Sequence, residues 1–202
     1  GALYAIGQNE DSWNQIAKAM YLAIIEDFGS DTWDLLKKQK PKEIKEIKAF
    51  DPWSENIQEW VRNRAADLIR NVTETTKDLV RNVIAVGMDE GQGVPKIAQA
   101  IRERYEGFTK RRSEVIARTE TVSASNFGSM ASAQQTGLNP MKVWVSSRDQ
   151  RVRDTHEGID GVMVGMNEEF HVGGDTMLHP GGGSLAKENV NCRCTLSYRV
   201  NR

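Results

Sequence analysis

Residues 53–86 form the longest stretch of this sequence without glycine or proline. Within it, seven apolar residues and one threonine recur at steps of four and three, which places them on one face of a helix: Val61, Ala65, Leu68, Val72, Thr75, Leu79, Val83 and Val86. This spacing predicts a single helix of about 50 Å, with Asp51 as its N-cap and Pro52 in its first turn. So narrow an apolar stripe needs a neighbour, either another helix of the chain or a partner protein. In the second case, the candidate partner-binding residues are Val61, Leu68, Val72 and Leu79.

The rest of the first 137 residues also has helical spacing. A cap at Asn9 or Asp11 predicts a helix through Phe28, which Gly29 to Asp31 should end before a short helix over 32–38. Pro95 restarts a helix over 94–105. A further helix follows Thr109, and its many small residues predict close approach to a neighbouring helix.

The start of that last helix is basic, although helix N-termini favour acidic residues. Lys110, Arg111 and Arg112 are therefore candidates to contact an external anion, and nucleic acid is the partner considered. The chain as a whole carries 27 Lys and Arg against 28 Asp and Glu, so its net charge does not indicate nucleic-acid binding. Any such contact must come from a local patch.

The pattern changes after residue 137. Short alternating or β-branched runs over 141–147, 161–165 and 192–200 predict strands, with glycine-, histidine- and aspartate-rich loops between them. We therefore predict an α+β fold, with a mainly helical N-terminal body that includes a long helix and a small, loop-rich, β-containing C-terminal module. The expected segments are 1–50, an N-terminal helical segment; 51–137, the long-helix body; and 138–202, the β-containing module.

The chain has two cysteines, Cys192 and Cys194, and three histidines, His156, His171 and His179, all in the C-terminal module. A C-x-C pair does not readily close a disulfide on itself, and in an extended strand the two thiols share a face. Two thiolates with His156 and His179 would complete a tetrahedral zinc site of a structural kind. The alternative is a pair of reduced thiols among loop histidines, because C-x-C is not the common zinc-ligand spacing. No apolar run is long enough for a membrane span, and we expect a soluble intracellular protein without a membrane partner.

A catalytic hypothesis remains open for the charged stretch 148–161. His156 could act as the general base of a metal-dependent nuclease or toxin-like hydrolase that also uses the C-terminal cysteines. Such a reaction would need further carboxylates, for which Glu168, Glu169 and Asp175 are the candidates. The alternative is a turn held by local ion pairs.

Several motifs occur together in one order: "IARTETVSASNFG", "RDQRVRDTHEGIDG", "HPGGGS" and "NCRC". This ordered set resembles the phage head morphogenesis family, the Mu F-like minor head proteins of tailed bacteriophages. The resemblance is dense over about 113–198 and looser over 57–112. The matching motif positions are Arg118, Thr119, Glu120, Asn126, Gly128, Asp149, Arg151, Arg153, His156, Gly161, Pro180, Asn191, Cys192 and Cys194.

The resemblance implies a structural protein rather than an enzyme, and it implies that the motif residues form a framework, with no catalytic residue among them. Such a protein would bind the phage portal protein and other head proteins in few copies or as an oligomer. It would assist head assembly, DNA packaging or delivery, with a contact to packaged DNA. Its expected location is the interior of the procapsid or virion near the portal, after assembly in the host cytoplasm.

Overall fold

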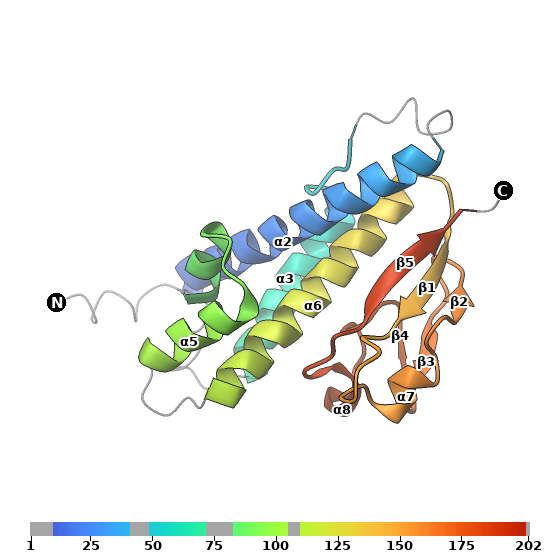
Figure 1. The fold of residues 1–202 in the computed structure, drawn as a ribbon. Coiled ribbons are helices and arrows are strands. Elements are labelled where there is room, and N and C mark those ends of the chain that lie inside the picture. The colour runs from blue at the N-terminus through green and yellow to red at the C-terminus, as the bar shows by residue number, and fades with distance from the viewer. Residues whose placement is uncertain (1–9, 41–48, 72–82, 105–109, 201–202) are drawn as a thin grey trace. The chain divides into compact units, whose positions relative to one another are not determined.

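The structure is a computed structural model, and it describes residues 10–40, 49–71, 83–104 and 110–200. The chain divides into two compact units, each made of two separate stretches of sequence. The first unit contains residues 1–23 and 53–117, and the second contains 24–52 and 118–202. The elements of both are labelled in Figure 1.

The first unit is helical in its described part. It contains α3 (Glu55–Asn71), a helical stretch over residues 83–89 and α5 (Val94–Arg104). The rings of Tyr21 and Trp60 meet edge to face, with centroids 5.6 Å apart. The remaining buried apolar side chains of this unit include Ile57, Val61, Ala65, Val83, Ile84, Ile97 and Ala98. The predicted break before the Pro95 helix is confirmed, since the amide of Gln92 donates to the carbonyl of Gly87 in a turn between the helices.

The predicted long helix can be compared with the structure only in part. Helix α3 begins at Glu55 rather than at Pro52, and residues 72–82 lie outside the described residues. The predicted cap residue, Asp51, lies four positions before the first residue of α3. The backbone amide of Asp51 donates to Oε1 of Gln135 at 2.7 Å, and Nε2 of Gln135 donates to the Asp51 carbonyl at 2.8 Å. Asp51 is therefore held at the C-terminal end of α6 (Lys110–Gln135), within the second unit.

The expected helix end at Gly29 is wrong, because α2 runs without a break from Glu10 to Gln39. Gly29 is buried, and a Cβ atom added there would come within 2.2 Å of the ring of Phe50. The glycine is thus explained by the aromatic ring that packs directly on the helix backbone. A glycine in a helix interior costs about 1 kcal/mol relative to alanine, and here that cost accompanies burial of Phe50.

The predicted close approach of small residues on α6 is confirmed. A Cβ atom at Gly128 would lie 2.7 Å from Cα of Ile25 on α2, so the two backbones are nearly in contact at this point. Next to it, the hydroxyls of Thr32 and Ser129 are hydrogen-bonded at 2.7 Å. Only a residue without a side chain fits between the two helices there.

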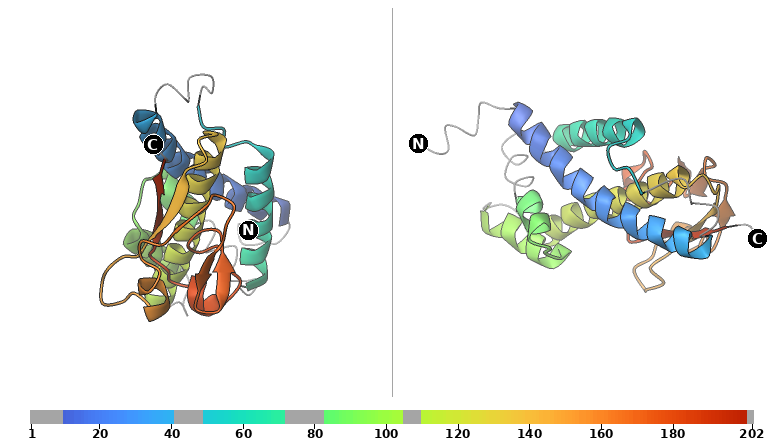
Figure 2. Two further views of the ribbon diagram at one scale, coloured as in Figure 1. Left: turned by 90° about the vertical axis from the view of Figure 1, so that its right-hand side faces the viewer. Right: turned by 90° about the horizontal axis from the view of Figure 1, so that it is seen from above.

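The second unit also contains two small antiparallel sheets. The first has the order β2-β1-β5, with β1 (Met141–Val145) between β2 (Met163–Val164) and β5 (Thr195–Arg199). Trp144 is the register partner of Leu196, and Figure 2 shows β1 and β5 side by side. Because β1 is the central strand, three consecutive residues, Lys142, Val143 and Trp144, are buried on its two faces.

The strands predicted around 141–147, 161–165 and 192–200 are confirmed, although the last begins only at Thr195. The structure adds a hairpin of β3 (Phe170–Val172) and β4 (Asp175–Met177) and two one-turn helices, α7 (Asp154–Glu157) and α8 (Ala186–Asn189). The predicted α+β class is confirmed, and the change from helix to strand falls between Gln135 and Met141. The boundaries 1–50, 51–137 and 138–202 stay a prediction. Among the described helices, none has the length and apolar character to cross a bilayer.

Candidate metal centre

His156 is presented by α7, the single helical turn that follows the charged stretch. The turn closes through the amides of His156 and Glu157, which both donate to the carbonyl of Arg153. The guanidinium of Arg153 in turn donates to the carbonyl of Val190. The imidazole is 1% exposed, and it meets the indole of Trp144 edge to face with ring centroids 5.4 Å apart. The ring thus has a defined position in the interior.

The two cysteines lie in the irregular segment before β5, not in a strand as predicted. Asn191 has a φ of 61°, a left-handed conformation that asparagine tolerates better than most residues. Its amide donates to the hydroxyl of Thr119 on α6 at 2.8 Å. The amide of Cys192 closes the turn on the carbonyl of Asn189 at 3.2 Å.

A second anchor on α6 holds the segment at Cys194. The buried Asn126 donates from Nδ2 to the Cys194 carbonyl at 3.1 Å and accepts at Oδ1 from the amide of Leu196 at 3.0 Å. One side chain therefore satisfies two backbone groups at the start of β5. These contacts give the motif residues Thr119, Asn126 and Asn191 a direct structural role.

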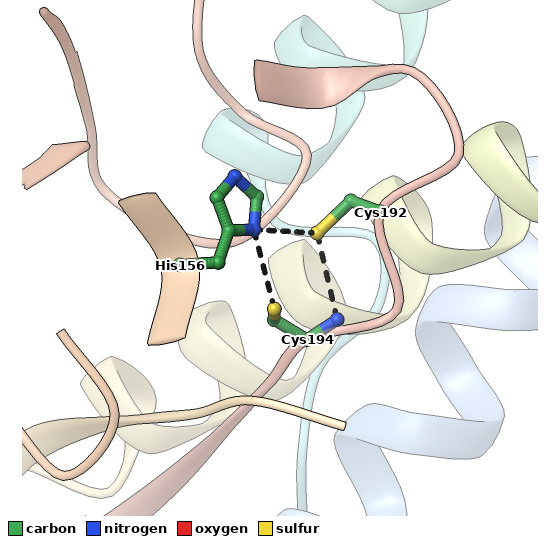
Figure 3. A group of neighbouring side chains, drawn as sticks. All are labelled: His156, Cys192 and Cys194. Atoms are coloured by element: carbon green, nitrogen blue, oxygen red, sulfur yellow. Dashed lines mark hydrogen bonds between the residues drawn. The ribbon is translucent and has the colours of Figure 1, made fainter. Parts of the chain in front are cut away.

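The three side chains converge on one buried point (Figure 3). Nδ1 of His156 lies 3.4 Å from Sγ of Cys194 and 3.7 Å from Sγ of Cys192. All three donor atoms lie within 4.8 Å of one another. Cys192 is 2% exposed and Cys194 is 4% exposed, and neither forms a disulfide. The cluster therefore offers two sulfur atoms and one nitrogen atom to a common centre.

Glu188, on α8, completes the surroundings of His156. Its Oε2 lies 3.2 Å from Nε2 of His156 and accepts a hydrogen bond from the hydroxyl of Thr155 at 2.9 Å. The carboxylate is 3% exposed, and its other oxygen is 3.7 Å from Nζ of Lys187. A buried carboxylate at this distance favours a proton on Nε2, which leaves the Nδ1 lone pair directed at the cysteines.

The two thiols differ in their affinity for a proton. Hydrogen bonding from Cys194 lowers the pKa of Cys192 below its ordinary value, against the effect of burial. The pKa of Cys194 is raised, first because it shares a hydrogen bond with Cys192 and then because it is buried. The backbone amide of Cys194 also points at Sγ of Cys192, at 3.4 Å. The site thus favours a thiolate at Cys192.

The structure brings together three of the four predicted zinc ligands. His156, Cys192 and Cys194 form the group, whereas His179 does not belong to it. His179 is buried elsewhere: its ring meets the ring of Phe127 with centroids 5.9 Å apart, and its Nδ1 lies 3.1 Å from the carbonyl of Pro180. His171, on β3, is exposed.

The charged stretch is held by local pairs. Asp149 accepts from the amide of Arg151 at 2.9 Å and from the guanidinium of Arg193 at 2.7 Å. Asp160 accepts from the amide of Ser146 at 2.8 Å and from Nε of Arg148 at 2.9 Å, and these bonds lower its pKa.

Of the three carboxylates proposed for a nuclease, Asp175 and Glu168 are hydrogen-bonded to neighbouring residues, and Glu169 is exposed. Oδ1 of Asp175 accepts from Ser184 at 3.0 Å, and its Oδ2 accepts from the amide of Leu185 at 2.8 Å. Asn189 accepts at Oδ1 from the amide of Gly183 at 2.8 Å, so the "HPGGGS" loop is held as a framework element. Glu168 accepts from the amide of Gly165 at 2.8 Å.

The other predicted binding residues are only partly described. Val61 is fully buried by the chain itself. Leu68 lies in α3, but its side chain is outside the described part, and Val72 and Leu79 fall in the undescribed segment 72–82. Lys110, Arg111 and Arg112 are the first residues of α6, and their side chains are also outside the described part.

Sequence reasoning missed Glu188, Trp144 and Lys142. Lys142 is fully buried, and its Nζ donates to the carbonyls of Glu168 and Leu178 at 2.8 and 2.9 Å. Burial lowers its pKa to about 8. No local spacing relates Glu188 to His156, because the loops that join them follow no helical or strand period. An early signal for Lys142 was its place inside an otherwise apolar strand.

Comparison with known proteins places these features in a family. The sequence profile described as "Phage Mu protein F like protein" matches residues 78–197, more than half of the chain. Minor head protein GP7 of Bacillus phage SPP1 is 33% identical over 129 residues, which are 61% of this chain and 42% of that protein. No solved structure matches the chain.

Two bacterial proteins are also similar. The NAD(+)–arginine ADP-ribosyltransferase EFV of Enterococcus faecalis is 37% identical over 119 residues, which are 57% of this chain and 24% of that protein. YqbB of Bacillus subtilis is 24% identical over 200 residues, 96% of this chain and 63% of that protein. The chain thus spans less than two thirds of the length of each of these relatives. With the matching profile and the motif residues that hold the cluster, the chain belongs to the family of Phage Mu protein F-like proteins.

Proposed function

We propose that this chain is a structural minor head protein of a tailed bacteriophage. The observation that carries the proposal is its 33% identity over 129 residues to the SPP1 minor head protein, within the region that matches the family profile. The motif residues described in the structure support it, since Asn126, Asn191 and Asp149 are engaged in hydrogen bonds that shape the module. Their role is to build a stable surface rather than to perform chemistry.

A non-enzymatic role is part of this proposal. His156, Cys192 and Cys194 are at most 4% exposed, so a macromolecular substrate cannot reach them in this conformation. Asp175 and Glu168, two of the three candidate carboxylates for phosphodiester hydrolysis, are bound to neighbouring loop residues. The region shared with the ADP-ribosyltransferase covers 24% of that protein, which supports a common module rather than a common activity.

In finer terms, the chain binds the portal protein and the interior of the head in few copies, and it assists assembly, DNA packaging or delivery. Of the predicted partner-binding residues, Leu68, Val72 and Leu79 are assigned to the portal, and Lys110, Arg111 and Arg112 are assigned to packaged DNA. Val61, the fourth residue of the predicted set, is buried by the chain itself, so it serves folding rather than docking.

The test is co-expression of the chain with the portal, scaffold and capsid proteins of its own phage genome, followed by purification of procapsids. We expect the chain to co-purify with procapsids and to cross-link to the portal protein. Leu79→Glu should reduce the cross-link, whereas Arg62→Glu, at an exposed position of α3, should not. Procapsids that contain no copy of the chain would refute the structural role. Incorporation without a portal cross-link would refute only the portal contact.

The DNA contact and the nuclease alternative have their own measurements. Lys110→Glu/Arg111→Glu should weaken retention of DNA, whereas the matched pair Lys37→Glu/Lys38→Glu, exposed at the end of α2, should leave it unchanged. Equal loss for both pairs would indicate only a general charge effect. DNA cleavage in the presence of Mg²⁺, Mn²⁺ or Zn²⁺ that disappears in His156→Ala would replace this proposal with the hydrolase.

A further inference from the structure

We propose that Nδ1 of His156 and the sulfur atoms of Cys192 and Cys194 bind a zinc ion that fastens α7 to the segment preceding β5. This inference does not depend on the head-protein role. It rests on the positions of four buried side chains, the three donors and Glu188.

The spacing of the donors fits a tetrahedral zinc ion. Zn–S bonds of about 2.3 Å and Zn–N bonds of about 2.0–2.1 Å place tetrahedral sulfur and nitrogen ligands about 3.5 Å apart. The two N···S distances, 3.4 Å to Cys194 and 3.7 Å to Cys192, lie on either side of this value. Two soft sulfur donors and one imidazole are also the donor types that zinc prefers over magnesium or calcium.

Glu188 provides the outer contact that a metal-binding imidazole ordinarily has. A metal-ligating histidine donates its other ring N–H to a carboxylate, a carbonyl or water, which orients the ring and increases its basicity. Here Nε2 faces Oε2 of Glu188 at 3.2 Å, and Thr155 holds the same oxygen at 2.9 Å. Nδ1 is then the free donor atom, and it is the atom that faces both sulfurs.

The donor set also fits a dication. Deprotonated Cys192 and Cys194 would neutralise Zn²⁺ on binding, and Glu188 would stay hydrogen-bonded to the imidazole through Oε2. Nζ of Lys187 lies 3.7 Å from the other oxygen of Glu188.

The position of the cluster indicates a structural ion. The bound segments are 36 to 38 residues apart in the sequence. The chain between them contains only short elements: β2 of two residues, the β3–β4 hairpin and the one-turn helix α8. Closing such a loop through a metal stabilises the native state, because the unfolded chain has no preformed site. The three protein ligands leave the fourth position of the tetrahedron, which we assign to water. The structural role therefore rests on the burial of the cluster and not on a closed set of four protein ligands.

Elemental mass spectrometry on untagged, full-length protein tests the proposal directly. We expect about one zinc per chain in the wild type, with zinc lost in Cys192→Ser and in His156→Gln. His179→Gln is the matched control, because it alters a buried histidine of the same unit outside the cluster, and it should keep its zinc. Wild-type protein free of metal even after expression in zinc-supplemented medium would overturn the proposal. So would zinc retained in His156→Gln.

Reconstitution covers the case in which variants fail to fold. Wild-type protein stripped with a chelator and titrated with Co²⁺ should develop thiolate-to-cobalt charge-transfer absorption and the intense visible bands of a tetrahedral ion. Added Zn²⁺ should remove both. If Co²⁺ produces only the weak spectrum of the hydrated ion, no thiolate site exists.

The role of Glu188 behind His156 can be tested by measuring zinc affinity. Glu188→Gln should weaken zinc affinity by about 10- to 100-fold in competition with a chromogenic chelator. Glu120→Gln, which alters a buried carboxylate on α6 away from the cluster, should leave the affinity unchanged. Equal affinities for Glu188→Gln and the wild type would refute the role of Glu188 and leave only the three-ligand part of the proposal.

Discussion

The imidazole of His156 and the carboxylate of Glu188 meet at 3.2 Å in the interior, although 32 residues separate them in the sequence. Each belongs to a helix of a single turn, α7 or α8. Neither helix has the length to be stable in isolation, so the loops between them must be held by other contacts. The contact between His156 and Glu188 therefore forms only when the loops between α7 and α8 are folded.

Glu188→Ala should lower the free energy of unfolding by about 1–3 kcal/mol, because Nε2 of His156 and the hydroxyl of Thr155 lose their common acceptor in the interior. The measurement is urea unfolding followed by circular dichroism. Glu26→Ala, at an exposed position of α2, is the matched control and should change stability by less than about 0.5 kcal/mol. Equal effects of the two variants would contradict the structural role of the pair.

Gly128→Ala should destabilise the protein by about 1–3 kcal/mol, despite the better helix propensity of alanine. The added methyl group would lie 2.7 Å from Cα of Ile25, and backbone atoms cannot rotate away. Gly29→Ala should cost less, because the obstacle there is the side chain of Phe50. Thermal unfolding of the two variants side by side decides the order. A larger loss for Gly29→Ala would show that the contact at Ile25 is not tight.

The lowered pKa of the buried Lys142 predicts that the stability of the protein depends on pH. Burial lowers its pKa in the folded state to about 8 from an ordinary value of 10.5. Between these values the unfolded chain binds more protons than the folded one, so the free energy of unfolding should rise with pH, by up to about 3 kcal/mol from this group. Below pH 8 the contribution is constant.

The control for Lys142 is Lys142→Met, which keeps the length of the side chain and removes the titrating group. Cysteine and tyrosine side chains also titrate in this range, so the informative quantity is the difference between the two stability curves from pH 7.5 to 10.5. The wild type should gain stability relative to Lys142→Met as the pH rises. Parallel curves would show that Lys142 titrates normally.

Asn126→Asp should destabilise the protein by about 1–3 kcal/mol, because an acceptor would replace the donor that faces the carbonyls of Cys194 and Val122. The change preserves shape, so the loss reports hydrogen bonding rather than packing. Asn167→Asp, at an exposed position, provides the comparison and should be nearly neutral. Chemical unfolding of both variants is the measurement. A neutral Asn126→Asp would mean that the start of β5 does not depend on α6.

Local sequence patterns determined much of the architecture. The small residues of α6 predicted its close helix contact, the restart at Pro95 predicted α5, and the alternation over 141–147 and 192–200 predicted β1 and β5. These features depend on neighbours within one or two turns, or on alternate residues of a strand, which a linear pattern records. The ordered motifs likewise identified the family, and Cys192, Cys194 and His156 were among the residues predicted to bind metal.

Tertiary packing decided the remainder. Gly29 has the local character of a helix end, yet α2 continues through it. The residue is glycine because the ring of Phe50 occupies the space that a side chain would need. His156 and His179 are equally plausible ligands in the sequence. Only the turns of α7, α8 and residues 189–194 bring His156 to the cysteines and Glu188 behind it, and place His179 against Phe127. Irregular loops have no period from which such distances follow, so these contacts are determined by three-dimensional packing alone.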